Sequence, residues 1–305
     1  MVENTRSIDA VATTILVIAI IFAVGPFYLV ITTASSSFEA TLRGIPLVPG
    51  SAFLDNLTYV LTETLIPRQI LNSLVVALIV TAGKGLVSFI SAFALVYFDM
   101  RGKAVIFAVI VATLMLPLEM RIVPSYAVAA NLFSPFQSIL DAIGVTGLIE
   151  PITGFRLAIE INILNSYLGI ALPLVATATG TFLFRQFFLS IPRELAQAAR
   201  IDGAGPFRFM VDILAPLSVA PLGALAVIMF LGAWNQYLWP LMVTTDPRLQ
   251  TAVIGLAQFD SGMAAGQAPL YHTMMAATLL VIIPPLLVIA LMQRLIVRGL
   301  VLGEK

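Results

Sequence analysis

Polar and ionisable side chains are rare within the apolar stretches of this 305-residue chain, so the few that occur there mark where chemistry could take place. Groups of this kind at membrane depth usually hydrogen-bond to another helix or line the path of a transported molecule. The chemistry that they offer is charge attraction and hydrogen bonding. The candidates for lining such a path are Lys84, Glu119, Arg121, Trp234, Asn235 and Gln236.

The charged candidates each allow two interpretations. A cation near the middle of a membrane helix costs about 2.5–3.5 kcal/mol on insertion scales, so Lys84 should face protein or water. It could attract an anionic substrate, but the simpler interpretation is an off-centre lysine whose stem snorkels to the cytoplasmic surface. Glu119 and Arg121 could contact a substrate or an external protein, and are more simply an interfacial charge pair.

The uncharged candidates are equally open. Asn235 and Gln236 could bond to a neighbouring helix or line the path. Trp234 and Trp239 could belong to the wall of the path or to the aromatic belt at the membrane surface, and the belt is favoured for Trp239. His272 begins an apolar stretch and is interpreted as an interfacial group without chemistry.

Several chemistries are excluded by residue counts. The chain has no cysteine and one histidine, so thiolate catalysis, disulfides, Cys-based metal sites and zinc sites built from His pairs are excluded. Its 16 basic and 16 acidic residues balance, which gives no argument for a nucleic-acid partner. No nucleophile with a base and an orienting group can be assembled. We therefore predict no catalytic residue, no metal and no cofactor in this chain.

The composition is that of an integral membrane protein. Hydrophobic residues make up 60% and charged residues 10%, against roughly 25% charged in soluble domains. A membrane-spanning helix needs about 20 mostly apolar residues. Six runs meet that length, which predicts an all-α membrane protein with a single domain over residues 1–305. The runs are about Ala10–Ala34, Ile70–Phe98, Ala104–Val123, Ser166–Leu189, Val219–Val243 and Tyr271–Val297.

The loops between these runs differ in basic charge. One side carries ten Lys and Arg residues and the other five. Because cytoplasmic loops are enriched in these residues, both termini and the loop 190–218 are predicted to be cytoplasmic. Residues 35–68 are expected to form an external loop. Residues 124–165 lack a run long enough to span and are expected to form short interfacial helices joined by turns, and about 133–164 of them are expected to be an external insertion.

The loop 190–218 has the pattern of two short helices joined by a glycine. Pro192 can open the first, which carries Glu194 in its first turn, and Gly203 can end it in a left-handed conformation. Pro206 can begin the second, and Pro216 is expected to stop it. Small residues form one face of the first helix, and an apolar stripe follows the second. The small residues are Ala196, Ala198 and Ala199, and the stripe is Phe207, Met210, Val211 and Leu214.

This loop resembles the cytoplasmic coupling motif of ABC importer permeases. The family pattern is Glu-Ala-Ala, three residues, Gly, nine residues, Ile, any residue, Leu, Pro. Ala198–Ala199, Gly203, Ile213 and Pro216 stand at matching intervals. Gln197 replaces the family glutamate and keeps its length and hydrogen-bonding capacity, and Ala215 stands where leucine is frequent. The resemblance implies that the ATPases contact Glu194, Gln197, Ala198, Ala199, Asp202, Gly203, Ala204, Phe207, Ile213 and Pro216.

Further segments are similar to the carbohydrate-type subfamily of these permeases. They are Thr181–Phe188, Trp234–Leu241 and Met292–Gly299. Residues 116–122 and 199–203 favour the permeases of glycerol-3-phosphate importers within it. The likeness covers nearly all six runs and leaves the segment 133–164 uncovered. It also implies an external loop that contacts a binding protein, at Gln258, Phe259, Asp260 and Ser261.

The resemblance implies a type I importer permease in a bacterial inner membrane. Such a permease works by alternating access with a homologous second permease, two ATPase subunits that bind ATP and Mg, and an external substrate-binding protein. The expected cargo is sn-glycerol-3-phosphate or a glycerophosphodiester, with a sugar or polyol as the alternative. The chain lacks a phosphate-binding P-loop, so ATP hydrolysis is assigned to the partners. An ion-coupled transporter is disfavoured, because no acidic residue falls clearly within a run.

Overall fold

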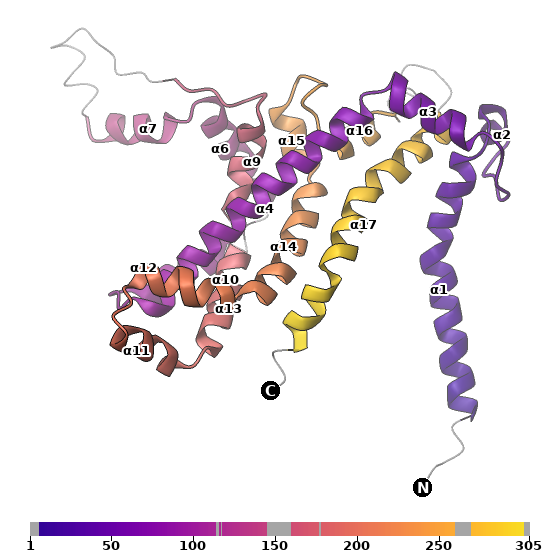
Figure 1. The fold of residues 1–305 in the computed structure, drawn as a ribbon. Coiled ribbons are helices and arrows are strands. Elements are labelled where there is room, and N and C mark those ends of the chain that lie inside the picture. Colours follow the sequence, from indigo (N-terminus) through magenta and orange to yellow (C-terminus); the bar gives the residue numbers. More distant parts are fainter. Residues whose placement is uncertain are drawn as a thin grey trace. The chain divides into compact units, whose positions relative to one another are not determined.

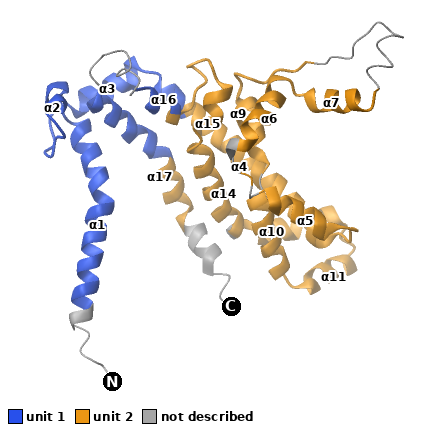
Figure 2. Cartoon of the chain, turned by 180° about the vertical axis from the view of Figure 1, so that it is seen from behind, with its two compact units in different colours: residues 1–70, 254–284 blue, residues 71–253, 285–305 orange. Residues whose placement is uncertain are grey.

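The computed structural model describes residues 6–113, 116, 118–144, 160–176, 178–259 and 270–301, and within them every regular element is helical (Figure 1). The chain divides into two compact units (Figure 2). The first comprises residues 1–70 and 254–284, and the second comprises residues 71–253 and 285–305. The expectation of one domain over residues 1–305 stays a prediction.

The first unit contains α1 (Arg6–Ala34), α2 (Phe38–Leu42) and α3 (Phe53–Glu63), together with parts of α4, α16 and α17. The predicted external loop 35–68 is therefore partly helical, which the sequence interpretation missed. Ser37 caps α2 by accepting a hydrogen bond from the Ala40 amide. The side chain of Asn56 in α3 donates to two backbone carbonyls at the end of α1, which ties these helices together.

The second unit contains the remaining helices and the other parts of α4, α16 and α17, which the two units share. Figure 1 shows α11 and α12 at one end of it and α6, α7 and α15 at the other. The bounds are α4 (Ile66–Tyr97), α5 (Lys103–Ala112), α6 (Leu118–Ala130), α7 (Ser134–Ala142), α9 (Tyr167–Val175), α10 (Ala178–Ser190), α11 (Arg193–Ile201), α12 (Pro206–Arg208), the π-helix η2 (Phe209–Leu214), α13 (Ala215–Leu217), α14 (Val219–Trp234), α15 (Leu238–Val243), α16 (Ala252–Phe259) and α17 (Tyr271–Val301).

Three helices among the described residues are long and apolar enough to cross a membrane, and they match the first, second and sixth predicted runs. They lie in α1, α4 and α17. Two bent helix pairs raise the number to five when each is counted as one span, and α5 is a shorter apolar helix. The described helices thus agree with a multi-pass membrane protein, and the exact number of six spans stays a prediction.

The third, fourth and fifth predicted runs are not continuous helices. The third is divided between α5 and α6. The fourth bends by 46° between α9 and α10, where Ala176 is extended at φ −69° and ψ 116°. The fifth breaks between α14 and α15, so Asn235 and Gln236 lie in an irregular turn rather than within a helix. Hydropathy alone cannot show such breaks, because the residues on both sides are equally apolar.

The core of the second unit is a cluster of phenylalanines that joins α4 and α10 to the loop 190–218. Phe89 meets Phe184 and Phe188 edge-on, with ring centroids 5.5 and 5.2 Å apart. Edge-to-face pairs of this kind are favoured by the ring quadrupoles. α10 approaches α4 closely at Gly180, where an added Cβ would overlap the Ser88 hydroxyl oxygen. These contacts fix α4 and α10 against each other.

Two backbone hydrogen bonds join the two ends of the segment 133–164 to each other. The amide of Leu132 donates to the carbonyl of Ile161, and the amide of Ile163 donates to that of Ala129, both at 2.9 Å. α7 lies within the segment, in agreement with the expected short helix. Residues 145–159 fall outside the described part of the chain.

Candidate functional site

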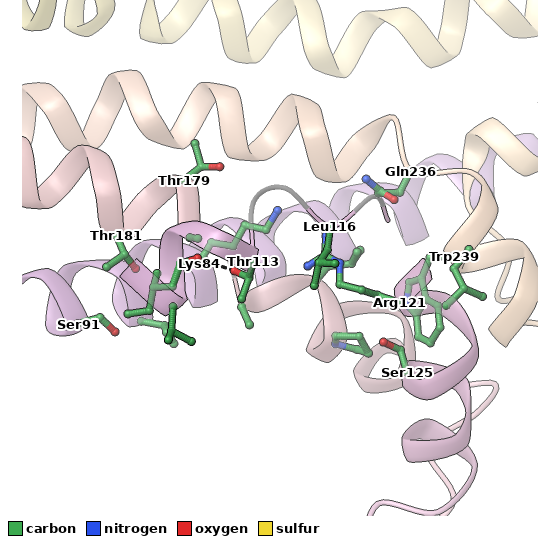
Figure 3. Close-up of a pocket in the computed structure, with 18 residues that line it drawn as sticks. Lys84, Ser91, Thr113, Leu116, Arg121, Ser125, Thr179, Thr181, Gln236 and Trp239 are labelled. Carbon is green, nitrogen blue, oxygen red and sulfur yellow. Dashed lines mark hydrogen bonds between the residues drawn. The ribbon is translucent and has the colours of Figure 1, made fainter. Parts of the chain in front are cut away.

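A cavity of about 630 Å³ lies within the second unit (Figure 3). This volume is typical of small-molecule sites, which occupy roughly 300–1,000 Å³. Its walls come from α4, α5, α6, α9, α10, the α14–α15 turn and α15. The lining residues are Lys84, Val87, Ser91, Val109, Ile110, Thr113, Leu116, Arg121, Ile122, Ser125, Pro173, Leu174, Ala176, Ala178, Thr179, Thr181, Gln236 and Trp239.

The cavity is positively charged. Lys84 enters it from α4 and Arg121 from α6, and none of the described lining residues is acidic. Two cations between apolar walls create a positive potential that raises the local concentration of anions. Among the residues that the structure describes, neither cation forms an ion pair. The arrangement therefore suits an anionic ligand with a polar remainder.

Residues at two breaks in the helices contribute to the lining of this cavity. The extended Ala176 and the first residues of α10 line it, and so does Gln236 in the turn after α14. Irregular backbone at membrane depth is tolerated where it is buried in protein or lines a water-filled space. Gln236 is anchored there by its side-chain amide, which donates to the carbonyl of Gly232 at 3.1 Å.

Trp239 forms a wall of the cavity, and its predicted place in the aromatic belt is wrong. Its side chain is only 2% exposed, and the indole N–H donates to the carbonyl of Ile170 at 3.0 Å. Because that N–H is the only donor of the indole, the ring is held in one orientation and presents an apolar face.

The structure brings three of the six predicted pathway residues together at the cavity, namely Lys84, Arg121 and Gln236. Lys84 thus faces a cavity, in agreement with the expectation that it faces protein or water. Trp234 does not line the cavity; it is buried and stacks on Phe230 with centroids 5.7 Å apart. Asn235 is exposed and does not line it either. The side chain of Glu119 lies outside the described residues, as does any pair that it forms with Arg121.

Sequence reasoning missed the hydroxyl groups of this cavity. Ser91, Thr113, Ser125, Thr179 and Thr181 all line it. Hydroxyls are common in membrane helices because they can bond to their own backbone, as Thr113 does to the carbonyl of Ile110 at 2.6 Å. Their presence in an apolar run is therefore a weak signal, and only the packing shows which of them share a cavity.

The predicted coupling loop has the expected two helices. α11 begins after Pro192, Gly203 is left-handed at φ +76°, and Pro206 begins α12. The prediction that Pro216 stops the second helix is wrong, because helix continues through α13 to Leu217. The π-helix before it explains the difference. A wider turn, shown by the bond from the Ala215 amide to the carbonyl of Met210, relieves the clash of a proline ring with the preceding turn.

One side of this loop packs on the phenylalanine cluster. Ala199, Phe209 and Leu214 are buried there, and Ala196, Ala204 and Ile213 are partly buried. The small-residue face is therefore turned largely toward its own chain, which supplies the support that so short a helix pair needs. The apolar stripe is also divided, since Phe207 and Val211 are exposed while Leu214 is buried.

The other side of the loop is open. Among the predicted coupling residues, Glu194, Gln197, Ala198, Asp202, Gly203, Phe207 and Pro216 are exposed. Phe207 is 74% exposed, and the neighbouring Ile201, which sequence reasoning did not select, is 86% exposed. Both side chains are therefore free to contact another protein.

The predicted binding-protein loop is only partly described, and it belongs to the first unit. Gln258 is exposed and Phe259 is half-buried at the end of α16, while Asp260 and Ser261 lie outside the described residues. His272 is buried in this unit, with its ring centroid 5.6 Å from that of Phe38, and its expected place at the membrane interface stays a prediction.

The fold is shared with a membrane transporter chain of known structure. The structure superimposes with a TM-score of 0.74 on a chain from the crystal structure of a bacterial ABC transporter involved in the import of the acidic polysaccharide alginate. The match covers 96% of this chain and 98% of that one, at 19% sequence identity, and shows the fold alone.

Residues 87–301 match the family described as binding-protein-dependent transport system inner membrane component, and the chain belongs to that family. It is therefore a multi-pass membrane component of a transporter. Curated relatives match over their whole length. The sn-glycerol-3-phosphate transport system permease proteins UgpE of Rhizobium meliloti and Pectobacterium atrosepticum are 40% and 41% identical to it, and that of Agrobacterium fabrum is 39% identical.

Proposed function

We propose that this chain is a permease subunit of an ATP-driven importer for sn-glycerol-3-phosphate or related glycerophosphodiesters. The observation that carries the proposal is the likeness of about 40% over the full length of this chain and of relatives named for that transport. The positively charged cavity supports it, because a phosphate ester is an anion with a small polar remainder.

The proposed assembly contains this chain, a homologous second permease, two ATPase subunits and an external binding protein. The chain crosses the membrane six times with both termini in the cytoplasm, α5 and α6 together supplying the third crossing. ATP and Mg bind to the ATPases. The exposed side of the coupling loop, with Ile201 and Phe207 outermost, contacts an ATPase.

The proposed mechanism is alternating access driven through the coupling loop. Closure of the ATPases on ATP moves the loop, and the phenylalanine cluster passes this movement to α4, α10 and α14. The same α4 and α10 line the charged cavity. A displacement at the cytoplasmic loop therefore changes the walls of the cavity, because packed side chains move together rather than deform.

A sugar or polyol importer is the second candidate, and one observation favours it. Trp239 presents a fixed apolar ring beside several hydroxyl groups, an arrangement that also suits a neutral polyhydroxylated molecule. Lys84 and Arg121 favour the phosphate ester instead, since neither has an ion-pair partner among the described residues and a neutral cargo would not use their charge.

Uptake by whole cells separates the two candidates. A strain deleted for its own phosphate-ester and sugar importers would receive the complete set of subunits, and uptake of radiolabelled sn-glycerol-3-phosphate and maltose would be compared. We expect uptake of the phosphate ester alone. Uptake of maltose alone would discard the proposed cargo and keep the importer.

A further inference from the structure

We propose that the cavity described above, here called the Lys84–Arg121 cavity, holds the phosphate group of the cargo during its passage. This inference rests on the proposed function and adds to it. It assigns the anion-binding part of the transport path to this subunit, and it names the two residues that form it.

The positive charge of the cavity has no acidic partner among the residues that the structure describes. Lys84 lies within the apolar helix α4, and Arg121 faces the same cavity. Neither forms an ion pair with a described residue, and the described lining contains no carboxylate. Isolated cations at membrane depth are costly, and they usually pair or mark the route of a charged substrate. An anion that enters the cavity is the partner that would compensate both.

An arginine together with a lysine is a combination that suits a phosphate group. A phosphate monoester has several acceptor oxygens, which suit the planar fork of an arginine together with the point charge of a lysine. Gln236 and the hydroxyls of Ser125 and Thr179 line the same cavity and can bond to the glycerol part. The fixed ring of Trp239 closes one side. The cavity thus has a charged part and a neutral part, as the cargo does.

The test uses the complete complex in proteoliposomes, with the binding protein at saturating concentration. The variants are Lys84→Gln and Arg121→Gln, which remove one charge each, and Lys84→Arg and Arg121→Lys, which keep it. Arg185→Gln is the matched control. Arg185 also lies on an apolar helix of this unit, but its guanidinium stacks on Phe107 at 4.2 Å and does not line the cavity.

Two quantities are measured for each variant. One is the initial rate of sn-glycerol-3-phosphate uptake, and the other is ATP hydrolysis in the presence of binding protein without cargo. We expect each glutamine variant to lower uptake roughly 10-fold to 100-fold, the range for loss of a charge-assisted contact. Hydrolysis without cargo should stay within twofold of the wild type. The charge-keeping variants should recover most of the uptake, and the control should lose little.

Three results would overturn the inference. Unchanged uptake in both glutamine variants would leave the importer intact and remove the anion site. An equal loss of uptake and of cargo-free hydrolysis, without recovery in Lys84→Arg and Arg121→Lys, would show a structural role only. A loss seen only in membranes that contain phosphatidylglycerol, and not in phosphatidylcholine alone, would assign the cavity to a lipid headgroup. The wild-type rates decide the proposed function separately, because a complex that moves maltose and no phosphate ester contradicts the cargo before any variant is compared.

Discussion

The ring of Phe209 lies 5.1 Å from the ring of Tyr97, with the two planes 67° apart. Phe209 belongs to the coupling loop and Tyr97 is the last residue of α4. The ring of Phe93, one turn earlier in α4, lies 6.4 Å from the ring of Phe209. This contact is the shortest aromatic link between the loop that is proposed to meet the ATPase and a helix that lines the cavity.

Truncation of Phe209 should uncouple ATP hydrolysis from the arrival of cargo. Phe209→Ala removes a buried ring, a change that costs about 3–5 kcal/mol in protein cores. We expect the complex to assemble in reduced amount and to hydrolyse ATP without a response to cargo. The measurement is cargo-stimulated hydrolysis per mole of assembled complex. Phe209→Leu is the control, since it refills most of the volume, and full stimulation in Phe209→Ala would contradict the linking role.

Gly203 should tolerate asparagine better than alanine. Its φ of +76° is strained for a residue with a Cβ by about 1–2 kcal/mol, although no atom would obstruct the Cβ itself. Asparagine visits this conformation more readily. We expect transport to fall in Gly203→Ala and to be partly kept in Gly203→Asn. Gly205→Ala is the matched control, because Gly205 has φ −70° and equally open surroundings. Equal effects at both glycines would show that backbone strain is not the cause.

Polar replacement of the outward apolar residues should weaken ATPase binding without unfolding the membrane helices. The variants are Ile201→Ser and Phe207→Ser, at positions that are 86% and 74% exposed. Exposed side chains contribute little to the fold, so the membrane helices should stay intact. The amount of ATPase that co-purifies should fall at least fivefold, the equivalent of about 1 kcal/mol of binding free energy. Phe136→Ser in α7 is the control, at 66% exposure and far along the chain. Undiminished co-purification of both variants would move the contact to another surface.

Asn72 should hold α4, α9 and the segment 248–250 together through its side-chain hydrogen bonds. Its side chain accepts a hydrogen bond from the Tyr167 hydroxyl at 2.7 Å and donates to the carbonyls of Arg248 and Gln250 at 2.9 Å. Asn72→Leu removes this partner from three buried or partly buried groups, at about 1–3 kcal/mol for each one left unsatisfied. Tyr167→Phe removes one bond and should cost less. Hydrogen exchange of residues 244–252 measures the effect, and identical protection in the two variants would argue against a clamp.

The long helices could be predicted from the sequence because their signal is local. α1, α4 and α17 depend on the mean hydropathy of about 20 neighbouring residues, which a single sequence shows directly. The turn at Gly203 and the start of α12 at Pro206 are local in the same sense, since each depends on one residue's backbone preference.

The site could be predicted only in part because its geometry depends on distant contacts. Lys84 and Arg121 were recognisable as unusual residues, but their meeting in one cavity depends on the tertiary arrangement that places residues of α4 and α6 around the same space. The orientation of Trp239 depends on Ile170, which is 69 residues away. Whether a tryptophan faces lipid or protein is therefore decided by tertiary structure rather than by its neighbours in sequence.

The proline at 216 shows how a local rule can be overridden. Proline stops an ordinary α-helix, yet here the preceding turn widens into a π-helix and the helix continues for one residue beyond it. The burial of Phe209 and Leu214 in the phenylalanine cluster favours this geometry, because it holds both ends of the wide turn.

The central claim is that this subunit couples ATP hydrolysis to the movement of a phosphate ester. Its most direct test is ATP hydrolysis by the reconstituted complex of this chain, the second permease, the ATPase and the binding protein. The cargoes compared are sn-glycerol-3-phosphate, glycerophosphocholine and maltose. The account predicts that the two phosphate esters stimulate hydrolysis and that maltose does not. Stimulation by maltose alone would contradict the assigned cargo, and failure of the chain to associate with any ATPase would contradict the coupling loop itself.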